Sequence, residues 1–336
     1  MGKLLSRSLR AAAKSLRPTR LQGVAYAILS GATFGTIPLF SMGAVRASYG
    51  TYSVSCYRFG FAVLLFGLMV LIRRIRLTVS WRQLLELCLL GAGCYGGSAF
   101  ALIHAYEFIP SGIATTINFL YPVMVALIMR FVFGERIGWR VALAIVLSLL
   151  GVALLAWEGG QAGMLDPRGI ASALITVLCY GIYIVGINKL SVRKLPGSVV
   201  TFYVLLFTFM TALVMAQFHG GVHPIDSWRI GVDLVLLALV SSIVSNLTLV
   251  LAVQSIGSTF TSVLGSVEPL TAITCGVLFL GETLQPQQAI GAAVVVLSVA
   301  FVVAGKGKKP HLPDIPPDLP NVPAAPIKPS NPNDSN

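Results

Sequence analysis

The sequence predicts an all-α polytopic membrane protein, with ten transmembrane helices arranged as two inverted five-helix repeats. Its 336 residues are 56% hydrophobic and only 11% charged, with a mean hydropathy of +0.83, whereas soluble domains carry about 25% charged residues. Apolar runs long enough to cross a bilayer, about 20 residues each, recur along the chain. The sequence also repeats itself at a shift of 146 to 147 residues. This composition excludes an ordinary soluble enzyme.

The predicted spans are apolar runs bounded by charged or turn-forming residues. The first run, 21–45, contains no charged residue. The eighth and ninth runs share a long uncharged stretch, which we divide at 254–258 because this short polar turn contains a glycine. The ten predicted spans are 21–45, 53–72, 87–106, 111–130, 140–157, 169–188, 198–218, 233–253, 260–280 and 287–304.

Basic residues predict the orientation of these spans. With a cytoplasmic N-terminus, 20 of the 24 lysine and arginine residues fall in cytoplasmic segments, as the positive-inside rule requires. The opposite face and its flanks keep four, namely Arg46, Arg58, Arg168 and Arg229. We therefore expect a multi-pass protein of the cell inner (plasma) membrane with both termini cytoplasmic. The excess of basic residues then reflects contact with an anionic leaflet, and no nucleic-acid partner is expected.

An internal duplication divides the chain. A shift of 147 residues aligns Ser98 with Ser245, Pro122 with Pro269 and Glu135 with Glu282, and a shift of 146 aligns Gly35 with Gly181. Because each copy has an odd number of spans, the second copy must cross the membrane in the opposite direction to the first. Inverted repeats of this kind build secondary transporters, with the substrate site near the midplane between the halves. The predicted parts are a basic tail (1–20), two repeats (21–157 and 158–305) and a Pro-rich tail (306–336).

Several short motifs carry a family resemblance. They are Gly31-Ala32-Thr33-Phe34-Gly35-Thr36, Tyr57-Arg58-Phe59, Tyr121-Pro122, Glu268-Pro269 and the two Gly-Glu pairs that close spans four and nine. By the order, spacing and duplication of these motifs, residues 21–305 resemble the ten-helix drug/metabolite transporter (DMT) superfamily, specifically its duplicated EamA-type group. The resemblance implies a permease that moves small metabolites, amino acids or drugs, often outward, through a central cavity between the repeats.

Glu268 is the predicted centre of the site, because it is the only acidic residue near a bilayer midplane. It directly precedes Pro269, which removes a backbone donor and frees carbonyl groups. A charged residue inside a span costs about 2.5–3.5 kcal/mol on insertion scales. Two functional roles fit this position: accepting a coupled proton, or binding the ammonium group of a substrate. The structural alternative is a neutral Glu268 hydrogen-bonded to a neighbouring helix. Its counterpart in the first repeat is Tyr121, so the predicted site is asymmetric.

Arg58 is the second ionisable residue inside a span, near the outer end of span two. One interpretation is that it attracts a carboxylate or pairs with an acid. The other is that it extends to the lipid head groups or ties helices together. Its counterpart in the second repeat is Leu205, so the duplication does not decide between them.

Polar and aromatic side chains on helical faces predict the lining of the site. Tyr180 and Tyr183 share one face, as do Asn118 and Tyr121, because residues three apart are neighbours on a helix. The alternative for each is hydrogen bonding between helices, worth about 0.6 kcal/mol per pair in bilayers. The predicted substrate-binding residues are Glu268, Asn118, Tyr121, Tyr95, Ser98, Tyr180, Tyr183, Ser245 and Asn246. Further candidates are Phe34, Thr36, Thr115, Thr176 and Ser241.

Small-residue motifs and cysteines have structural interpretations. Two glycine pairs, Gly31 with Gly35 and Gly93 with Gly97, are typical of membrane helices whose backbones approach closely. The five cysteines all lie inside apolar runs without the spacing of metal ligands. Neither disulfides nor a metal site is therefore expected.

The sequence contains no motif of an enzyme. Its four histidines form no HExxH motif, and there is no P-loop or Asp-rich pair. We expect no enzymatic activity and no cofactor, so that any driving energy comes from gradients of substrate or protons. Glu135 and Glu282 close their spans, and capping or pairing with a nearby basic residue is expected for Glu135.

The function predicted from these features is a secondary transporter that exports small metabolites or amino acids by alternating access. One alternative is a nutrient importer of the same fold. The other is a non-transporting membrane sensor or scaffold acting through the tail, whose regularly spaced prolines favour a polyproline II helix. Deleting residues 310–336 separates these functions, because a carrier should keep its flux. The expected partners are a small-molecule substrate and the lipid bilayer, and a homodimer is compatible with the sequence.

Overall fold

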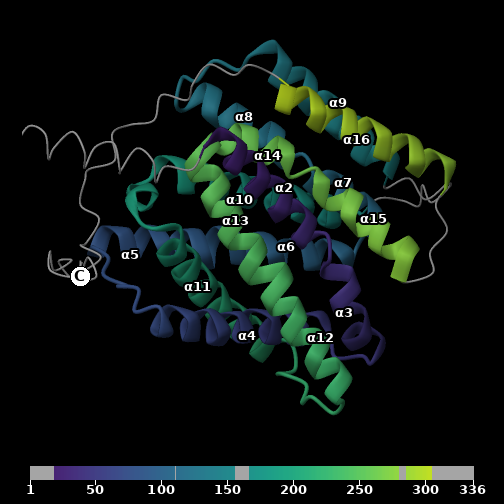
Figure 1. Ribbon diagram of the computed structural model, residues 1–336. Coiled ribbons are helices and arrows are strands. Elements are labelled where there is room, and N and C mark those ends of the chain that lie inside the picture. Colours follow the sequence, from purple (N-terminus) through teal and green to yellow (C-terminus); the bar gives the residue numbers. More distant parts are fainter. Residues whose placement is uncertain (1–18, 110, 156–165, 280–284, 305–336) are drawn as a thin grey trace, which may run out of the picture. The chain divides into compact units, whose positions relative to one another are not determined.

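The computed structural model describes residues 19–109, 111–155, 166–279 and 285–304 of the chain. Within these residues every regular element is a helix (Figure 1). The predicted proline-rich tail lies outside the described residues, as do Glu282 and residues 1–18 of the predicted basic tail.

Each repeat contributes five spans. In the first repeat they are α2–α3 (Arg20–Phe34 and Ile37–Arg46), α4 (Thr51–Ile72), α5–η1–α6 (Trp81–Cys88, Leu89–Gly96 and Gly97–Tyr106), α7–α8 (Ser111–Asn118 and Tyr121–Phe131) and α9 (Trp139–Leu155). In the second they are α10 (Pro167–Lys189), α11 (Gly197–Phe218), α12–η3–α13 (Trp228–Ala238, Leu239–Val244 and Ser245–Ile256), α14–α15 (Ser258–Leu264 and Val267–Phe279) and α16 (Pro286–Ala304). A short 3-10 helix, η2 (Ser191–Lys194), precedes α11. Among the described residues, nine spans are long and apolar enough to cross a membrane, and α9 is a shorter apolar helix. The predicted ten-helix membrane fold is confirmed.

Three spans are interrupted, each a few residues before a proline. The breaks lie at 34–37, 118–121 and 264–267, before Pro38, Pro122 and Pro269. A proline provides no N–H, and its ring clashes with the carbonyl of the residue four positions earlier. A shorter bond closes the third break, where Glu268 N donates to Gly265 O at 2.9 Å. The helix is therefore broken just before Pro269.

Spans three and eight each contain a π-helical segment, η1 and η3, at overlapping positions of the two repeats. Carbonyl groups of both segments accept hydrogen bonds from a span of the opposite repeat. Thr208 Oγ1 of α11 donates to Gly91 O at 2.9 Å, and Arg58 Nη2 of α4 donates to Ser241 O at 3.0 Å. The wide turn of a π-helix is frequently found at functional sites.

The close helix contact predicted at Gly93 and Gly97 is wrong, because Gly91 and Gly96 take that place. A Cβ on Gly91 would lie 2.8 Å from a backbone oxygen of α11, and one on Gly96 would lie 3.4 Å from a side chain of α11. Among the described residues, a Cβ on Gly93 would meet only its own helix, and one on Gly97 would lie 4.0 Å from the Cys179 Sγ of α10, which is an ordinary packing distance. The π-helical hydrogen bonds run between residues five apart, so glycines five residues apart face α11 together.

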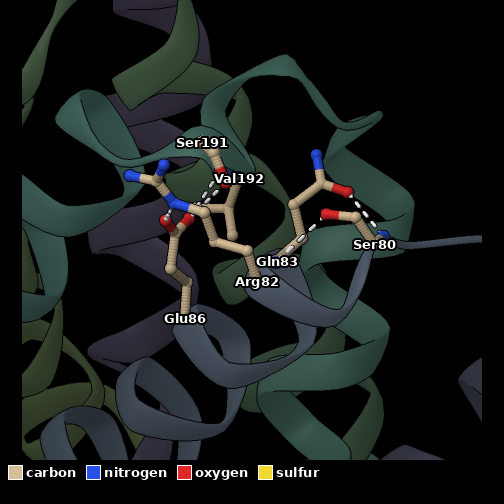
Figure 2. Close-up of polar contacts among 6 residues, drawn as sticks. All are labelled: Ser80, Arg82, Gln83, Glu86, Ser191 and Val192. Atoms are coloured by element: carbon tan, nitrogen blue, oxygen red, sulfur yellow. Dashed lines mark hydrogen bonds and ion pairs between the residues drawn. The ribbon is translucent and has the colours of Figure 1, made fainter.

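Two spans begin earlier than predicted. Span three starts at Trp81 instead of residue 87, and span eight at Trp228 instead of residue 233. A capping box starts α5: the Ser80 hydroxyl accepts from Gln83 N at 3.3 Å, and Gln83 Oε1 accepts from Ser80 N at 2.9 Å (Figure 2). These first turns are polar, so an apolar run alone does not include them.

Reciprocal hydrogen bonds join the two repeats. Ser30 Oγ of α2 donates to Ser245 O of α13 at 2.8 Å, and Thr176 Oγ1 of α10 donates to Ser98 O of α6 at 3.3 Å. Thr176 lies 146 residues after Ser30, and Ser245 lies 147 residues after Ser98. Each repeat therefore places its first span against the third span of the other. The last spans, α9 and α16, pack side by side (Figure 1).

Candidate substrate site

Glu268 lies at the start of a helix that begins inside span nine. It is the second residue of α15, and a helix N-terminus favours negative charge. Its counterpart, Tyr121, is the first residue of α8, after the equivalent break in the first repeat. The repeats thus present an acid and a phenol at matching helix starts. Discontinuous helices of this kind supply ion and substrate sites in transporters built from inverted repeats.

The backbone at Glu268 is held by α2. A Cβ on Gly31 would lie 3.3 Å from Glu268 N, and a Cβ on Gly35 would lie 2.4 Å from Glu268 O. Only glycine allows this approach, so the close contact predicted for the pair is confirmed. The packing fixes the position from which the Glu268 side chain projects.

The Glu268 carboxylate forms no hydrogen bond or ion pair with another of the described residues. The residue is partly exposed, and Tyr95, Tyr121 and Tyr180 lie within range of its charge. The predicted alternative, a structural hydrogen bond from Glu268 to a neighbouring helix, is not seen within the described ranges. A carboxyl group in this position can take up a proton or a cationic group.

Four tyrosines form an aromatic cluster across the two repeats. The ring centroids of Tyr95 and Tyr183 are 5.0 Å apart, and those of Tyr121 and Tyr180 are 4.8 Å apart in an edge-to-face arrangement. Tyr95 also lies 6.4 Å from Tyr180. These separations match favourable aromatic pairs. The first repeat supplies Tyr95 and Tyr121, and the second supplies Tyr180 and Tyr183.

Two buried amide atoms near these helix breaks and rings have no protein partner. Tyr183 OH donates to Asn246 Oδ1 at 2.6 Å, but within the described part of the chain no acceptor lies within hydrogen-bond distance of Asn246 Nδ2, although the residue is fully buried beside Tyr95. Asn118 Oδ1, on the last residue of α7, likewise has no hydrogen-bond partner among the residues that the structure describes. An unsatisfied buried polar atom costs about 1–3 kcal/mol, so each is suited to a ligand. They offer one donor and one acceptor.

Arg58 links two spans beside this cluster. Its Nε donates to Ser242 Oγ at 2.7 Å and its Nη2 donates to Ser241 O at 3.0 Å. Thr36 adds a contact of 2.8 Å between its hydroxyl and that of Ser241. The charges of Arg58 and Glu268 act on one another, but no ion pair joins them in the described part of the chain. These bonds favour the interpretation in which Arg58 ties helices together.

Comparison with known proteins agrees with this architecture. The EamA-like transporter family matches residues 21–157 and, a second time, residues 167–304. The chain belongs to the EamA-like transporter family. It is therefore a multi-pass membrane transporter of the DMT superfamily.

Relatives of this EamA-like chain include named exporters. The threonine/homoserine exporter RhtA of Escherichia coli (strain K12) is 26% identical over 230 residues, which cover 66% of this chain and 72% of RhtA. An uncharacterized transporter of Synechocystis sp. is 26% identical over 207 residues, covering 60% of this chain and 61% of that protein. A solved structure, titled only as the crystal structure of a protein, matches 84% of this chain and 98% of its own with a TM-score of 0.71 and 18% identity. That match shows a shared fold.

Two of the predicted substrate-binding residues of this EamA-like chain take part in helix packing. Ser98 and Ser245 are the reciprocal acceptors between repeats, through their carbonyl groups. The Ser245 hydroxyl donates to Ser241 O at 2.7 Å within its own span. Thr176 and Ser30, the donors, are also buried. By contrast, Glu268, Asn246 and the four tyrosines share one network of ring contacts, hydrogen bonds and charge.

Sequence analysis did not identify Ser242 as the partner of Arg58. The available signal was a pair of adjacent serines in an apolar span, inside the stretch equivalent to the η1 segment. Glu135 forms an ion pair, although its partner is not a neighbour in the sequence: Lys189 Nζ, at the end of α10, lies 2.8 Å from its carboxylate.

Arg58→Lys is expected to lower the melting temperature of the purified chain, because one amine cannot replace the two bonds of the guanidinium. We expect a loss of about 1–3 kcal/mol of stability. The matched control is Thr208→Val, which removes one neutral bond to the other π-helix and should cost about 1 kcal/mol. An unchanged melting temperature with weakened substrate affinity would instead assign Arg58 to the substrate.

Proposed function

We propose that this chain is a secondary carrier that exports a small metabolite, of the amino-acid class, across the inner membrane by alternating access. The supporting observation is the Glu268 carboxylate, which lies at a helix break with no protein partner among the described residues. It suits an ammonium group or a coupled proton. Asn246 Nδ2, a buried and unpartnered donor, suits a carboxylate. The exporters to which the chain is similar act on threonine and homoserine.

Alternating access follows from the two halves. Reciprocal contacts such as Ser30 to Ser245 and Thr176 to Ser98 give the repeats nearly equivalent interfaces. Two equivalent halves can exchange conformations and open one site to each side in turn. In this proposal both termini are cytoplasmic, because basic residues gather on that side. The partners are the solute and the lipid bilayer, and a homodimer stays a prediction.

Untargeted metabolite profiling of medium and cells tests this function. Cells producing the wild type, Glu268→Gln or Glu135→Gln are compared with cells carrying an empty vector. An amino acid enriched outside only with wild type and Glu135→Gln supports export. A solute depleted from the medium and gained by the cells reverses the direction. No difference at confirmed expression, across a panel of amino acids, contradicts the proposal.

A further inference from the structure

Two matching hydrogen bonds fasten a loop of each repeat to the second span of the other. Tyr57 OH of α4 donates to His223 O, in the segment before α12, at 2.6 Å. Tyr203 OH of α11 donates to Leu77 O, in the segment before α5, at 2.8 Å. Tyr203 follows Tyr57 by 146 residues, and His223 follows Leu77 by 146 residues. The two bonds are therefore copies of one contact, and the inversion of the repeats places them at opposite ends of the spans.

The contact that includes Tyr57 is reinforced by aromatic and polar groups. We call it the outer clasp, formed by Tyr49–Tyr57 and residues 219–227. The ring of His219 stacks on Tyr52 at 3.9 Å, and the ring of His223 stacks on Tyr49 at 4.4 Å.

Backbone amides also close the outer clasp. His223 N donates to Ser53 Oγ at 3.0 Å, and Asp226 N donates to Tyr49 OH at 3.0 Å. The Tyr49 hydroxyl donates to the Asp226 carboxylate. Desolvation raises the pKa of Tyr49, so this phenol keeps its proton at neutral pH.

The contact that includes Tyr203 is reinforced by a second set of hydrogen bonds. We call it the inner clasp, formed by Tyr203, residues 73–86 and η2. The Glu86 carboxylate accepts from Ser191 Oγ at 2.6 Å and from Val192 N at 3.2 Å, and Arg82 lies 3.2 Å away (Figure 2). The counterpart of Glu86 is Asp233, whose carboxylate lies 3.2 Å from the place of a Cβ on Gly43 in α3. Asp233 lies outside the outer clasp, but each of these two carboxylates lies against a segment of the opposite repeat.

The two clasps are joined by the packing of α4 against α11. A Cβ on Gly60 would lie 3.0 Å from the Phe209 ring, and one on Gly67 would lie 3.4 Å from the Phe202 ring. This contact lies between the clasps, with Tyr57 near the first turns of α4 and Tyr203 near the first turns of α11. Rocking one repeat on the other about this contact separates the repeats at one end and presses them together at the other.

We propose that Tyr57 and Tyr203 are paired gating residues, so that opening the outer clasp favours closure of the inner clasp, and the reverse. The inference rests on the proposed alternating-access carrier. Tyr57 and Tyr203 act by positioning the repeats and do not touch the substrate. Because each contributes one neutral hydrogen bond, its loss shifts the balance of the two states by roughly fivefold.

Hydrogen exchange of the full-length chain, followed by mass spectrometry, tests the coupling without a substrate. The amides of His223 and Asp226 report on the outer clasp, and the amide of Val192 reports on the inner clasp. Tyr57→Phe should speed exchange in 219–227 by roughly fivefold and slow it at Val192. Tyr203→Phe should do the opposite.

Two further variants complete the test. Glu86→Leu removes the oxygen that accepts from Ser191 and Val192 and so opens the inner clasp by different bonds. It should match Tyr203→Phe, and Tyr26→Phe, outside both clasps, should change neither. Faster exchange at the mutated clasp alone, or at both clasps equally, overturns the inference. If the variants speed hydrogen exchange at one clasp and slow it at the other, but the chain moves no solute, the coupling of the clasps is supported and the carrier proposal is contradicted.

Discussion

Replacing Glu268 with glutamine is expected to reduce flux about 30-fold or more. The substitution keeps the size of the side chain but removes the charge that has no protein partner among the described residues. When the carboxylate pairs with the ammonium group of a bound solute and water is excluded, losing one member of that pair costs about 2–5 kcal/mol. Flux is measured with the solute identified by metabolite profiling, in vesicles that contain equal amounts of folded protein.

The pH dependence of the same variant separates the two roles of Glu268. If the residue carries the coupled proton, flux in Glu268→Gln no longer responds to an imposed pH gradient. If it binds the ammonium group, the KM for the solute rises and the response to the gradient remains. Wild-type flux together with a wild-type pH response would contradict both roles.

Glu135→Gln is the matched control for this experiment. Glu135 closes the span equivalent to the one that carries Glu268, and its side chain is 49% exposed in its ion pair with Lys189. Exposed pairs are worth about 0–1 kcal/mol, so flux should stay close to that of the wild type. A comparable loss in both variants would indicate a general effect of removing negative charge.

The ten spans could be predicted because lipid imposes a simple requirement. Every backbone group must be satisfied inside the segment, so hydropathy alone finds the helices. The breaks before Pro122 and Pro269 follow in the same way from the chemistry of proline. The duplication then predicted that the two repeats are inverted. The hydrogen bonds that Ser30 and Thr176 donate lie at equivalent positions of the two repeats, in agreement with that prediction.

The π-helical segments could not be predicted because their cause is not local. The carbonyls of Gly91 and Ser241 take donors from α11 and α4, and the donors differ, being Thr208 in one repeat and Arg58 in the other. No periodic pattern in the sequence indicates which donor will bind which carbonyl group. The error at Gly93 has the same origin, because a spacing of four residues suits an α-helix and Gly93 lies in the wider η1 segment.

Some features of the candidate site could be predicted from the sequence, and others depend on how distant helices pack. The shared face of Tyr180 and Tyr183 follows from helical spacing, and their ring centroids lie 6.0 Å apart. The meeting of these rings with Tyr95 depends on how α10 packs against η1, which no local pattern contains. In the sequence, a small hydroxyl side chain such as that of Ser245 fits both the lining of a site and a contact between helices. The size of the side chain does not decide between these two roles. The roles of the site residues stay predictions until flux is measured.

Gly35→Ala is expected to destabilise the chain and to displace Glu268. The added Cβ would lie 2.4 Å from the Glu268 carbonyl oxygen and 2.6 Å from the Thr271 Cβ, and a backbone atom cannot rotate away. Overpacking of this kind costs about 1–3 kcal/mol. Because α15 must shift to relieve the clash, flux should fall further than stability alone explains. Melting temperature and flux are measured on the same preparations.

The duplication supplies the control for this variant. Gly181 is the counterpart of Gly35, and a Cβ there would lie 2.9 Å from Met124 Cγ, in a flexible side chain that can move aside. Gly181→Ala should therefore be the milder of the two, although both place one methyl group at matching positions. If Gly181→Ala lowers flux as much as Gly35→Ala, the effect belongs to helix packing in general. If only Gly35→Ala loses flux at a temperature where both variants are folded, the position of Glu268 relative to α2 is what transport requires.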